Sequence, residues 1–336
     1  MTSMYPLTEK VPPPAALETC EPEAKTPEER LLDGMPGRAF CLPSATWLSQ
    51  HEIIAGLRHC DAEPAIPCQD AAASGISPFP FVIVADGAGS AAVSDWGARA
   101  VVVALSRLLK TLHRHLAAVL DEDGVDEERG RDTAHLLVNH AQGTLVDLAQ
   151  AHRRPVRDLR CTLLLAVRGR KKLLWLKVGD GALVLEKMRL GDDGGGNSEW
   201  STLGKPGKGV FANETVFVDD GLRPADIQYG LVSARDVCAV GAMSDGAALA
   251  LVSHDGKEVS SRLSQWSAAL RAGTLKRSHL TRSFYDGAFA RRALGDDCAL
   301  ALVSCALEPP TQHNDVGCAS PSRELNRNGR ASPGLR

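Results

Sequence analysis

The sequence lacks several features that mark common protein classes. Of its 336 residues, 38 are Lys or Arg and 41 are Asp or Glu, so the formal net charge of −3 gives no overall positive field for nucleic acid. No apolar run is long enough to span a bilayer, and the first residues show no basic segment followed by an apolar one, as a secretory signal would. These absences predict a cytoplasmic protein that binds neither nucleic acid nor a membrane.

The nine cysteines form no CxxC pair, so the sequence contains neither a zinc ribbon nor a thioredoxin-like motif. Several of them lie in apolar runs such as CTLLLAV and CALALVSC. We interpret the cysteines as small buried side chains in a reducing compartment.

Composition changes twice along the chain. Residues 1–40 are rich in Pro, Glu and Lys and show no apolar periodicity, which predicts a disordered leader, and residues 307–336 predict a disordered tail for the same reason. Residues 41–306 are then expected to form one domain. No internal repeat is present.

Within this domain, short apolar runs predict buried strands and two long segments predict helices. Residues 94–120 are expected to form one long helix, residues 121–132 a charged loop and residues 260–273 another helix, with a further helix before Pro155. Strands are expected at WLSQHEIIAGL, FPFVIVADG, CTLLLAV, KLLWLKVG, GALVLEK, ETVFVDD, VCAVGAMSDG and CALALVSC. This order favours an α+β fold in which two antiparallel sheets stack and helices lie outside them.

Aspartates stand where these apolar runs begin or end. Asp86, Asp180 and Asp245 each precede a glycine at the end of a run, Asp70 lies in PCQDA, and Asp296 shortly precedes CALALVSC. Carboxylates that meet at one sheet edge raise each other's pKa unless a cation is present, and Mg²⁺ and Mn²⁺ prefer such oxygen ligands. An isolated Asp-Gly is more typical of a turn. The residues alone therefore favour a metal site and leave the enzyme class open.

Five motifs occur in an order that resembles a known family: PCQDA, FVIVADGAGS with SDWGA, KVGDG, GAMSDG and GDDCALALV. From about Trp47 to Ser304 the chain is similar to the type 2C (PPM) metal-dependent Ser/Thr protein phosphatases, and GLRHCDAEPAIPCQDA and VFANETVFV resemble the bacterial branch. The resemblance implies a β-sandwich of two antiparallel sheets flanked by helices. It also implies hydrolysis of phosphoserine or phosphothreonine by metal-activated water, on a phosphorylated protein substrate, with a cognate Ser/Thr kinase as a further partner.

The resemblance assigns metal ligands residue by residue. Asp86 resembles the aspartate that bridges two ions, and Gly87 the glycine that offers its carbonyl oxygen. Asp245 and Asp296 resemble the carboxylates of the second ion. Asp180 resembles the residue that, with Asp245, holds a third, weaker ion. The implied cofactor is Mn²⁺ or Mg²⁺, as two ions and a weaker third.

Three further residues resemble the catalytic positions of the family. Asp70 matches the aspartate that orients metal-bound water. Arg58 in GLRHC is the candidate for the phosphate-binding arginine, because a guanidinium group matches phosphate oxygens, and His59 lies beside it. A solvated surface arginine is the alternative for Arg58.

Two positions depart from the family pattern. Many members have His directly after Asp-Gly as a candidate general acid, where this chain has Ala88. A positioned acid is worth about 10²–10⁴-fold in rate. A second hypothesis therefore stays open, a catalytically weak or inactive module that binds a phosphorylated partner. Asp297 replaces the usual asparagine beside Asp296.

Overall fold

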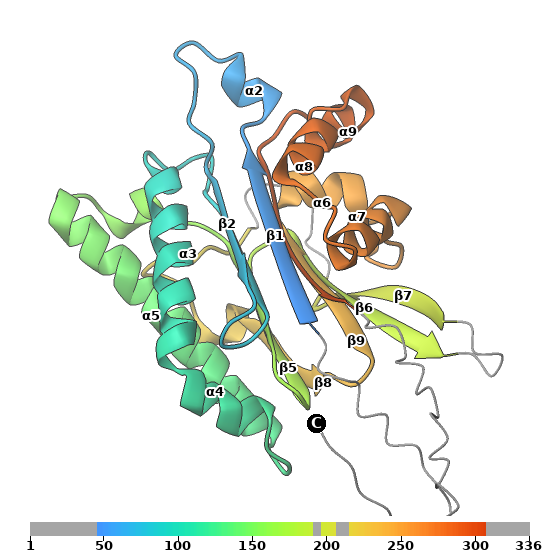
Figure 1. Ribbon diagram of the computed structural model, residues 1–336. Coiled ribbons are helices and arrows are strands. Elements are labelled where there is room, and N and C mark those ends of the chain that lie inside the picture. The colour runs from blue at the N-terminus through green and yellow to red at the C-terminus, as the bar shows by residue number, and fades with distance from the viewer. Residues whose placement is uncertain (1–45, 191–195, 206–214, 307–336) are drawn as a thin grey trace, which may run out of the picture. The chain divides into compact units, whose positions relative to one another are not determined.

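The computed structural model describes residues 46–190, 196–205 and 215–306, which form two five-stranded antiparallel sheets flanked by helices (Figure 1). The first sheet contains, in order, β1 (Thr46–Ile54), β10 (Cys298–Ala306), β9 (Val237–Met243), β6 (Ala182–Leu190) and β7 (Gly196–Leu203). The second contains β2 (Asp70–Gly75), β3 (Phe81–Asp86), β4 (Leu163–Arg168), β5 (Lys172–Val178) and β8 (Gln228–Ser233). The predicted fold class is confirmed.

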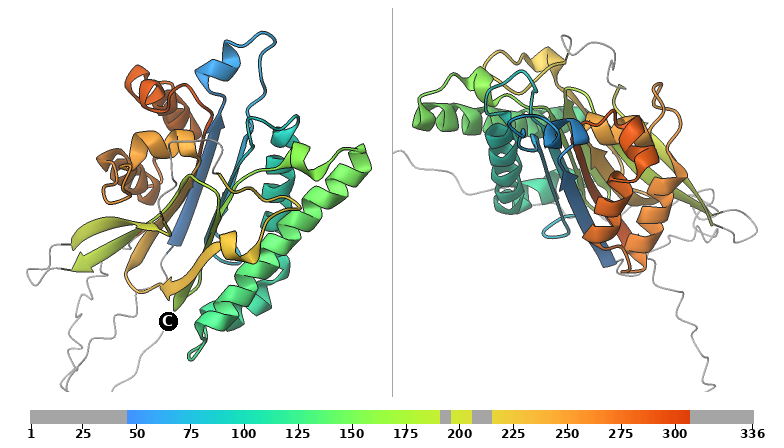
Figure 2. Two further views of the ribbon diagram at one scale, coloured as in Figure 1. Left: turned by 180° about the vertical axis from the view of Figure 1, so that it is seen from behind. Right: turned by 90° about the horizontal axis from the view of Figure 1, so that it is seen from above.

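Helices cover the outer face of each sheet, giving four layers (Figure 2). The second sheet packs on α3 (Ser94–Thr111), α4 (His113–Leu120) and α5 (Glu127–His152). The first packs on α6 (Asp245–Leu251), α7 (Ser261–Arg271), α8 (Arg277–Phe284) and α9 (Gly287–Arg292). Short helical turns complete the described elements: α2 (Leu57–Cys60), η1 (Val156–Leu159) and η3 (Pro224–Asp226).

The inner faces of the two sheets meet in a core of small and branched apolar side chains. Val84 and Leu164 of one sheet pack in the same buried cluster as Ala242 and Ala301 of the other. Alternate residues of β3 and β4, such as Ile83, point to the helical side instead and join the cluster under α3 and α5. Both faces of these strands are buried, which explains why they are continuously apolar in sequence.

Two predicted boundaries on the helical side are wrong. The long helix predicted over residues 94–120 is divided at Leu112 into α3 and α4. The predicted charged loop ends at Asp126, whose carboxylate accepts a hydrogen bond from Arg129 N at 3.0 Å and caps α5. Acidic residues favour a helix N-terminus, so the charges of Glu127 and Glu128 mark the first turn of α5 rather than a loop.

The prediction of a strand at ETVFVDD is also wrong for residues 215–220, the part of this segment that the structure describes. From Thr215 on, this segment forms only an isolated bridge, between Val218 and Cys161. The remaining predicted strands are present, and β2, β7 and β8 were not anticipated. The predicted leader and tail lie outside the described residues, and no helix within the described ranges is long and apolar enough to cross a membrane.

Candidate metal centre

Asp70 and Asp86 face each other across the β2–β3 pair. The two strands are antiparallel, and Asp70 and Asp86 are register partners at the end where β2 begins and β3 ends. Thr162 fixes Asp86 from the other side, because its Oγ1 accepts from Asp86 N at 3.0 Å and its N–H donates to Asp86 O at 2.8 Å. Gly87 N donates to Gln69 O at 3.1 Å and extends the pairing by one step.

Asp245 and Asp296 adjoin strands β9 and β10 of the first sheet. β9 ends at Met243, and the next residue, Ser244, pairs with Ala299 of β10 through Ser244 N to Ala299 O at 3.1 Å and Ala299 N to Ser244 Oγ at 2.9 Å. Asp245 is therefore the first residue of α6, not the last of a strand. The same pairing brings Asp296, which precedes β10, close enough for its charge to raise the pKa of Asp245.

Asp180 lies in the turn between β5 and β6, which connects the two sheets. Thr215 Oγ1 donates to Asp180 Oδ2 at 2.9 Å. Gly179 and Gly181 flank it with φ of 94° and 77°, which residues with a Cβ rarely adopt. A Cβ on Gly181 would also lie 2.6 Å from Met243 O, so the close approach of this turn to β9 requires glycine.

The carboxylates of this centre repel one another in a desolvated place. Burial first, and then the charges of Asp297 and Asp245, raise the pKa of Asp70 well above its usual range. The pKa of Asp86 is raised well above its usual range by burial and then by Asp70 and Asp245. Burial and the nearby Asp180 raise the pKa of Asp245 to about 6. The structure therefore brings these predicted residues into one electrostatically unfavourable cluster.

The cluster fits a divalent cation by two observations. Both side-chain oxygens of Asp70 are buried and make no hydrogen bond of ordinary geometry in the described structure, although such atoms are nearly always satisfied. The Ser244 and Asp86 side chains lie near enough to offset only part of the rise in the pKa of Asp70. The neighbours of the Asp70 oxygens are hard oxygen donors, which Mg²⁺ and Mn²⁺ prefer. In the described ranges, however, no three His, Cys, Asp or Glu side chains are arranged so that they could hold a metal ion as they stand.

Arg58 and His59 lie on α2, beside the turn that precedes β10. Arg58 N donates to Gly295 O at 3.0 Å, and the Arg58 side chain is exposed and packs along Gly295. His59 is turned instead toward Asp297, with Nδ1 2.9 Å from Asp297 Oδ1. The structure thus places the two neighbouring residues in different surroundings.

Asp297 is the residue whose importance the sequence analysis missed. It is only 4% exposed, and its two oxygens accept hydrogen bonds from Gly56 N at 2.7 Å and Gln69 N at 2.6 Å, besides the His59 contact. One carboxylate therefore joins the start of α2, the start of β2 and the start of β10. The Asp-Asp pair before the last strand was the only sequence signal.

Lys177 is a second residue without a sequence-based role. It is 1% exposed on β5, and its ammonium donates to Gly181 O at 2.8 Å and Lys205 O at 3.1 Å. Burial lowers its pKa to about 8, while the charge of Asp180 opposes the shift. Its signal was a lysine inside the apolar run KLLWLKV.

Ala88, after the Asp-Gly pair, is buried and carries no proton donor. Its N–H donates to Arg160 O at 3.1 Å, and Arg160 Nη2 donates to Ser90 Oγ at 2.6 Å. The loop after β3 is thus held against the segment that precedes β4.

Comparison with known proteins agrees with this architecture. The solved serine-threonine phosphatase 2C of Toxoplasma gondii is 12% identical over 78% of this chain and 95% of its own, with a TM-score of 0.53. Stp1 of Staphylococcus aureus is 12% identical (82% and 100% covered, TM-score 0.47), and the PstP catalytic domain, solved with two manganese ions, is 15% identical (77% and 99%, TM-score 0.46). No protein of curated function matches the chain significantly.

At these identities the structural likeness shows the fold alone. The sequence itself matches the model of the protein phosphatase 2C family over residues 56–282, which include α2, Asp70, Asp86, Asp180 and Asp245. That match extends over more than half of the chain. The chain therefore belongs to the protein phosphatase 2C family, a family of serine/threonine phosphatases.

Proposed function

We propose that this chain hydrolyses phosphoserine and phosphothreonine on proteins with the help of divalent metal ions, Mn²⁺ or Mg²⁺. The observation that carries the proposal is the cluster of Asp70, Asp86 and Asp245, whose pKa values are raised by burial and by one another. Such a cluster is unfavourable without a cation and favourable with one.

We assign the metal-holding groups to the carboxylates of Asp86, Asp180, Asp245 and Asp296 and to the carbonyl of Gly87. When bound, divalent ions neutralise phosphoryl oxygens and lower the pKa of coordinated water. β2, β3 and the β9–α6 corner supply fixed backbone for these groups, so little reorganisation is needed when charge develops.

The chain's own residues would bind and orient the substrate. Asp70 has two buried oxygens that make no hydrogen bond of ordinary geometry in the described structure, and either can accept a hydrogen bond from an attacking water and fix its direction. Arg58 is exposed on α2 with its side chain packed along Gly295, next to Asp296 in sequence, and the donors of a guanidinium can bind phosphoryl oxygens in pairs. We keep His59 as a candidate catalytic residue beside Arg58, with its Nδ1 2.9 Å from Asp297 Oδ1.

The test is phosphate release from p-nitrophenyl phosphate and a phosphoserine peptide with Mn²⁺, Mg²⁺ or EDTA. We expect metal-dependent turnover that Asp86→Ala and Asp245→Ala abolish. Asp132→Ala is the matched control, because Asp132 is an exposed carboxylate on α5. Metal-independent turnover, or turnover that survives both substitutions, would contradict the proposal.

Ala88 supports a second candidate, a module that binds a phosphorylated partner with little or no turnover. A buried methyl group stands where a proton donor is expected, so protonation of the leaving oxygen has no obvious source at this position. Calorimetry distinguishes the two candidates. Mn²⁺ binding that Asp86→Ala abolishes, together with no hydrolysis, would favour the binding module.

A further inference from the structure

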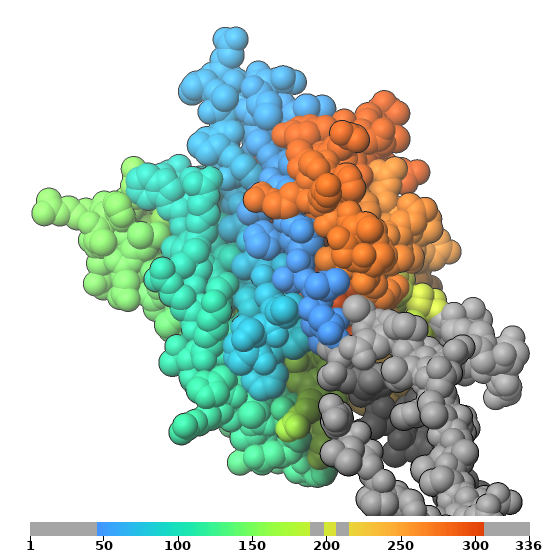
Figure 3. All heavy atoms as spheres, viewed as in Figure 1, coloured from blue at the N-terminus to red at the C-terminus, as the bar shows by residue number. Residues whose placement is uncertain are grey.

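The outer face of α3 and α4 carries an unbalanced positive charge. Residues 94–120 contain four Arg or Lys residues and one acidic residue, Asp95, a net charge of +3 within a chain whose total is −3. Both helices lie uncovered on the face shown in Figure 3. The positive charge of these helices is therefore local and presented to solvent.

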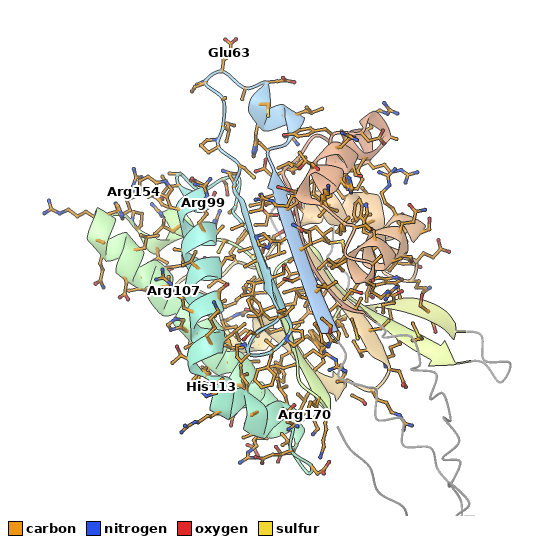
Figure 4. All side chains as sticks on the ribbon, viewed as in Figure 1. Glu63, Arg99, Arg107, His113, Arg154 and Arg170 are labelled. Carbon is orange, nitrogen blue, oxygen red and sulfur yellow. The ribbon has the colours of Figure 1, made fainter. Side chains whose placement is uncertain are left out.

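The charged residues recur at helical spacing. Arg99, Val103, Arg107 and Lys110 follow one another at intervals of three or four residues, which places them on one side of α3, and all are exposed. Arg114 continues the series in α4. Figure 4 shows Arg99 and Arg107 one below the other along α3. We call Arg99, Val103, Arg107, Lys110 and Arg114 together the basic face, after its four positively charged members.

Internal carboxylates do not neutralise the basic face. Arg99 Nη1 lies 3.9 Å from Asp95 Oδ2, a loose contact. Within the described ranges, the side chains of Arg107, Lys110 and Arg114 make no ion pair. Like charges at this spacing destabilise a helix, so a negatively charged partner that covers the face would relieve the repulsion and stabilise the helix. Val103 lies in the middle of the basic face, and its 48% exposed side chain offers a partner an apolar contact.

The Arg99 end of the basic face adjoins the candidate metal centre. Arg99 Nη2 donates to Cys68 O at 3.4 Å, two residues before Asp70. Nearby, the Arg154 guanidinium lies 5.8 Å from the ring centroid of Trp96, near the start of α3. A chain that reaches the centre from this side would run along α3.

We propose that the basic face is a docking surface for an acidic segment of the substrate polypeptide, which rests on the proposed phosphatase function. From Arg99 to Lys110, α3 rises about 16 Å, and Arg114 in α4 extends the face by about one further turn, a length that an extended chain covers with about seven residues. The preferred substrate then carries several Asp or Glu residues and one apolar residue within about seven positions, next to its phosphorylated residue.

The experiment measures binding by fluorescence anisotropy, so that it needs no turnover. The probes are a labelled phosphoserine peptide with a seven-residue acidic tract and the same peptide with Gln and Asn in that tract. The variant is R107E/K110E/R114E in the full chain. The control R235E/K257E/R292E changes the net charge equally at exposed positions away from α3 and α4.

At 50 mM NaCl we expect the variant to bind the acidic peptide about tenfold more weakly than the unaltered protein and the control, with the difference falling to about twofold at 500 mM. Binding of the neutral peptide and turnover of p-nitrophenyl phosphate should not change. If turnover is absent while the acidic peptide still binds through this face, the catalytic proposal fails and the docking surface stands.

Equal affinity of variant and control for the acidic peptide would overturn the docking proposal. Two further probes test other anionic partners: vesicles containing phosphatidylserine and duplex DNA. If the R107E/K110E/R114E variant loses affinity for either of these and keeps it for the acidic peptide, the face serves a membrane or nucleic acid, and the proposal is wrong. Circular dichroism of each variant checks that the helices are intact.

Discussion

Asp297 offers the sharpest test of how this site is held together, through the substitution Asp297→Ala. The change removes the acceptor of Gly56 N and Gln69 N, at 2.7 and 2.6 Å, and the contact with His59 Nδ1 at 2.9 Å. Because the carboxylate is only 4% exposed, water cannot readily take its place. Two backbone N–H groups are left without acceptors at the junction of three segments.

The magnitude follows from those two donors. A buried donor left unsatisfied costs about 1–3 kcal/mol, so Asp297→Ala is expected to lower the free energy of unfolding by about 2–6 kcal/mol. In a domain of this size that corresponds to a fall in Tm of roughly 10 °C. Asp297→Asn retains one acceptor oxygen and turns its amide N–H toward the other donor, so about half of the loss should remain.

Urea and thermal unfolding, followed by circular dichroism, measure the effect. The control is Asp255→Ala, because Asp255 also accepts two hydrogen bonds, from Ser253 Oγ at 2.7 Å and Lys257 N at 3.1 Å, but is exposed. Water can replace that carboxylate, so its removal should change Tm little. If Asp297→Ala lowers Tm no more than Asp255→Ala does, the reasoning from buried donors is refuted.

Three further predictions concern stability. Glu186→Ala should lower the free energy of unfolding in urea by about 3–5 kcal/mol, because Glu186 is fully buried and pairs with Arg271 at 2.8 Å; an unchanged midpoint would contradict this. In EDTA, the Tm measured by differential scanning fluorimetry should fall as pH rises from about 4 to above 6. The reason is that a folded pKa of about 6 for Asp245 leaves the folded state more protonated than the unfolded one over this range. Asp245→Asn should flatten this dependence of Tm on pH. Gly246→Ala should destabilise by about 1–3 kcal/mol, because the new Cβ would lie 2.2 Å from a backbone carbonyl oxygen, whereas Gly143→Ala, with open space, should stabilise α5 by up to about 1 kcal/mol. A Gly246→Ala variant as stable as the unaltered protein, or a Gly143→Ala variant as destabilised as Gly246→Ala, would refute the packing argument.

The strands that sequence reasoning found are those buried on both faces. Phe81–Asp86 and Leu163–Arg168 are continuously apolar because one face meets the opposite sheet and the other meets helices. Asp70–Gly75 escaped notice because it is Ala, Ser and Gly after the aspartate, residues with little β propensity, and it is a strand only because it pairs with β3. Gly196–Leu203 is a polar strand at the edge of its sheet.

The residues of the candidate site also divide into those whose position the sequence predicts and those whose contacts it does not. The convergence of Asp70, Asp86 and Asp245 could be predicted, because the short motifs that contain them occur in the family's order and each adjoins an apolar run. Their roles as ligands and orienting groups stay predictions. The contacts of Asp297 could not, because Gly56 and Gln69 lie 241 and 228 positions away in the sequence. No local pattern records which distant N–H group a carboxylate will meet.

The division of the candidate ligands between the two sheets makes the site sensitive to the core below it. Asp70 and Asp86 lie on strands of one sheet, whereas Asp245 and Asp296 adjoin strands of the other, so apolar packing between the sheets, together with the hydrogen bond from Gln69 N to Asp297, sets the spacing between the two halves. A change of one methyl group at Val84 or elsewhere in that packing would shift one sheet against the other. Sequence drift in the core and tuning of catalytic geometry are therefore coupled in this fold, and distant core substitutions become a route by which activity can be adjusted without altering any ligand.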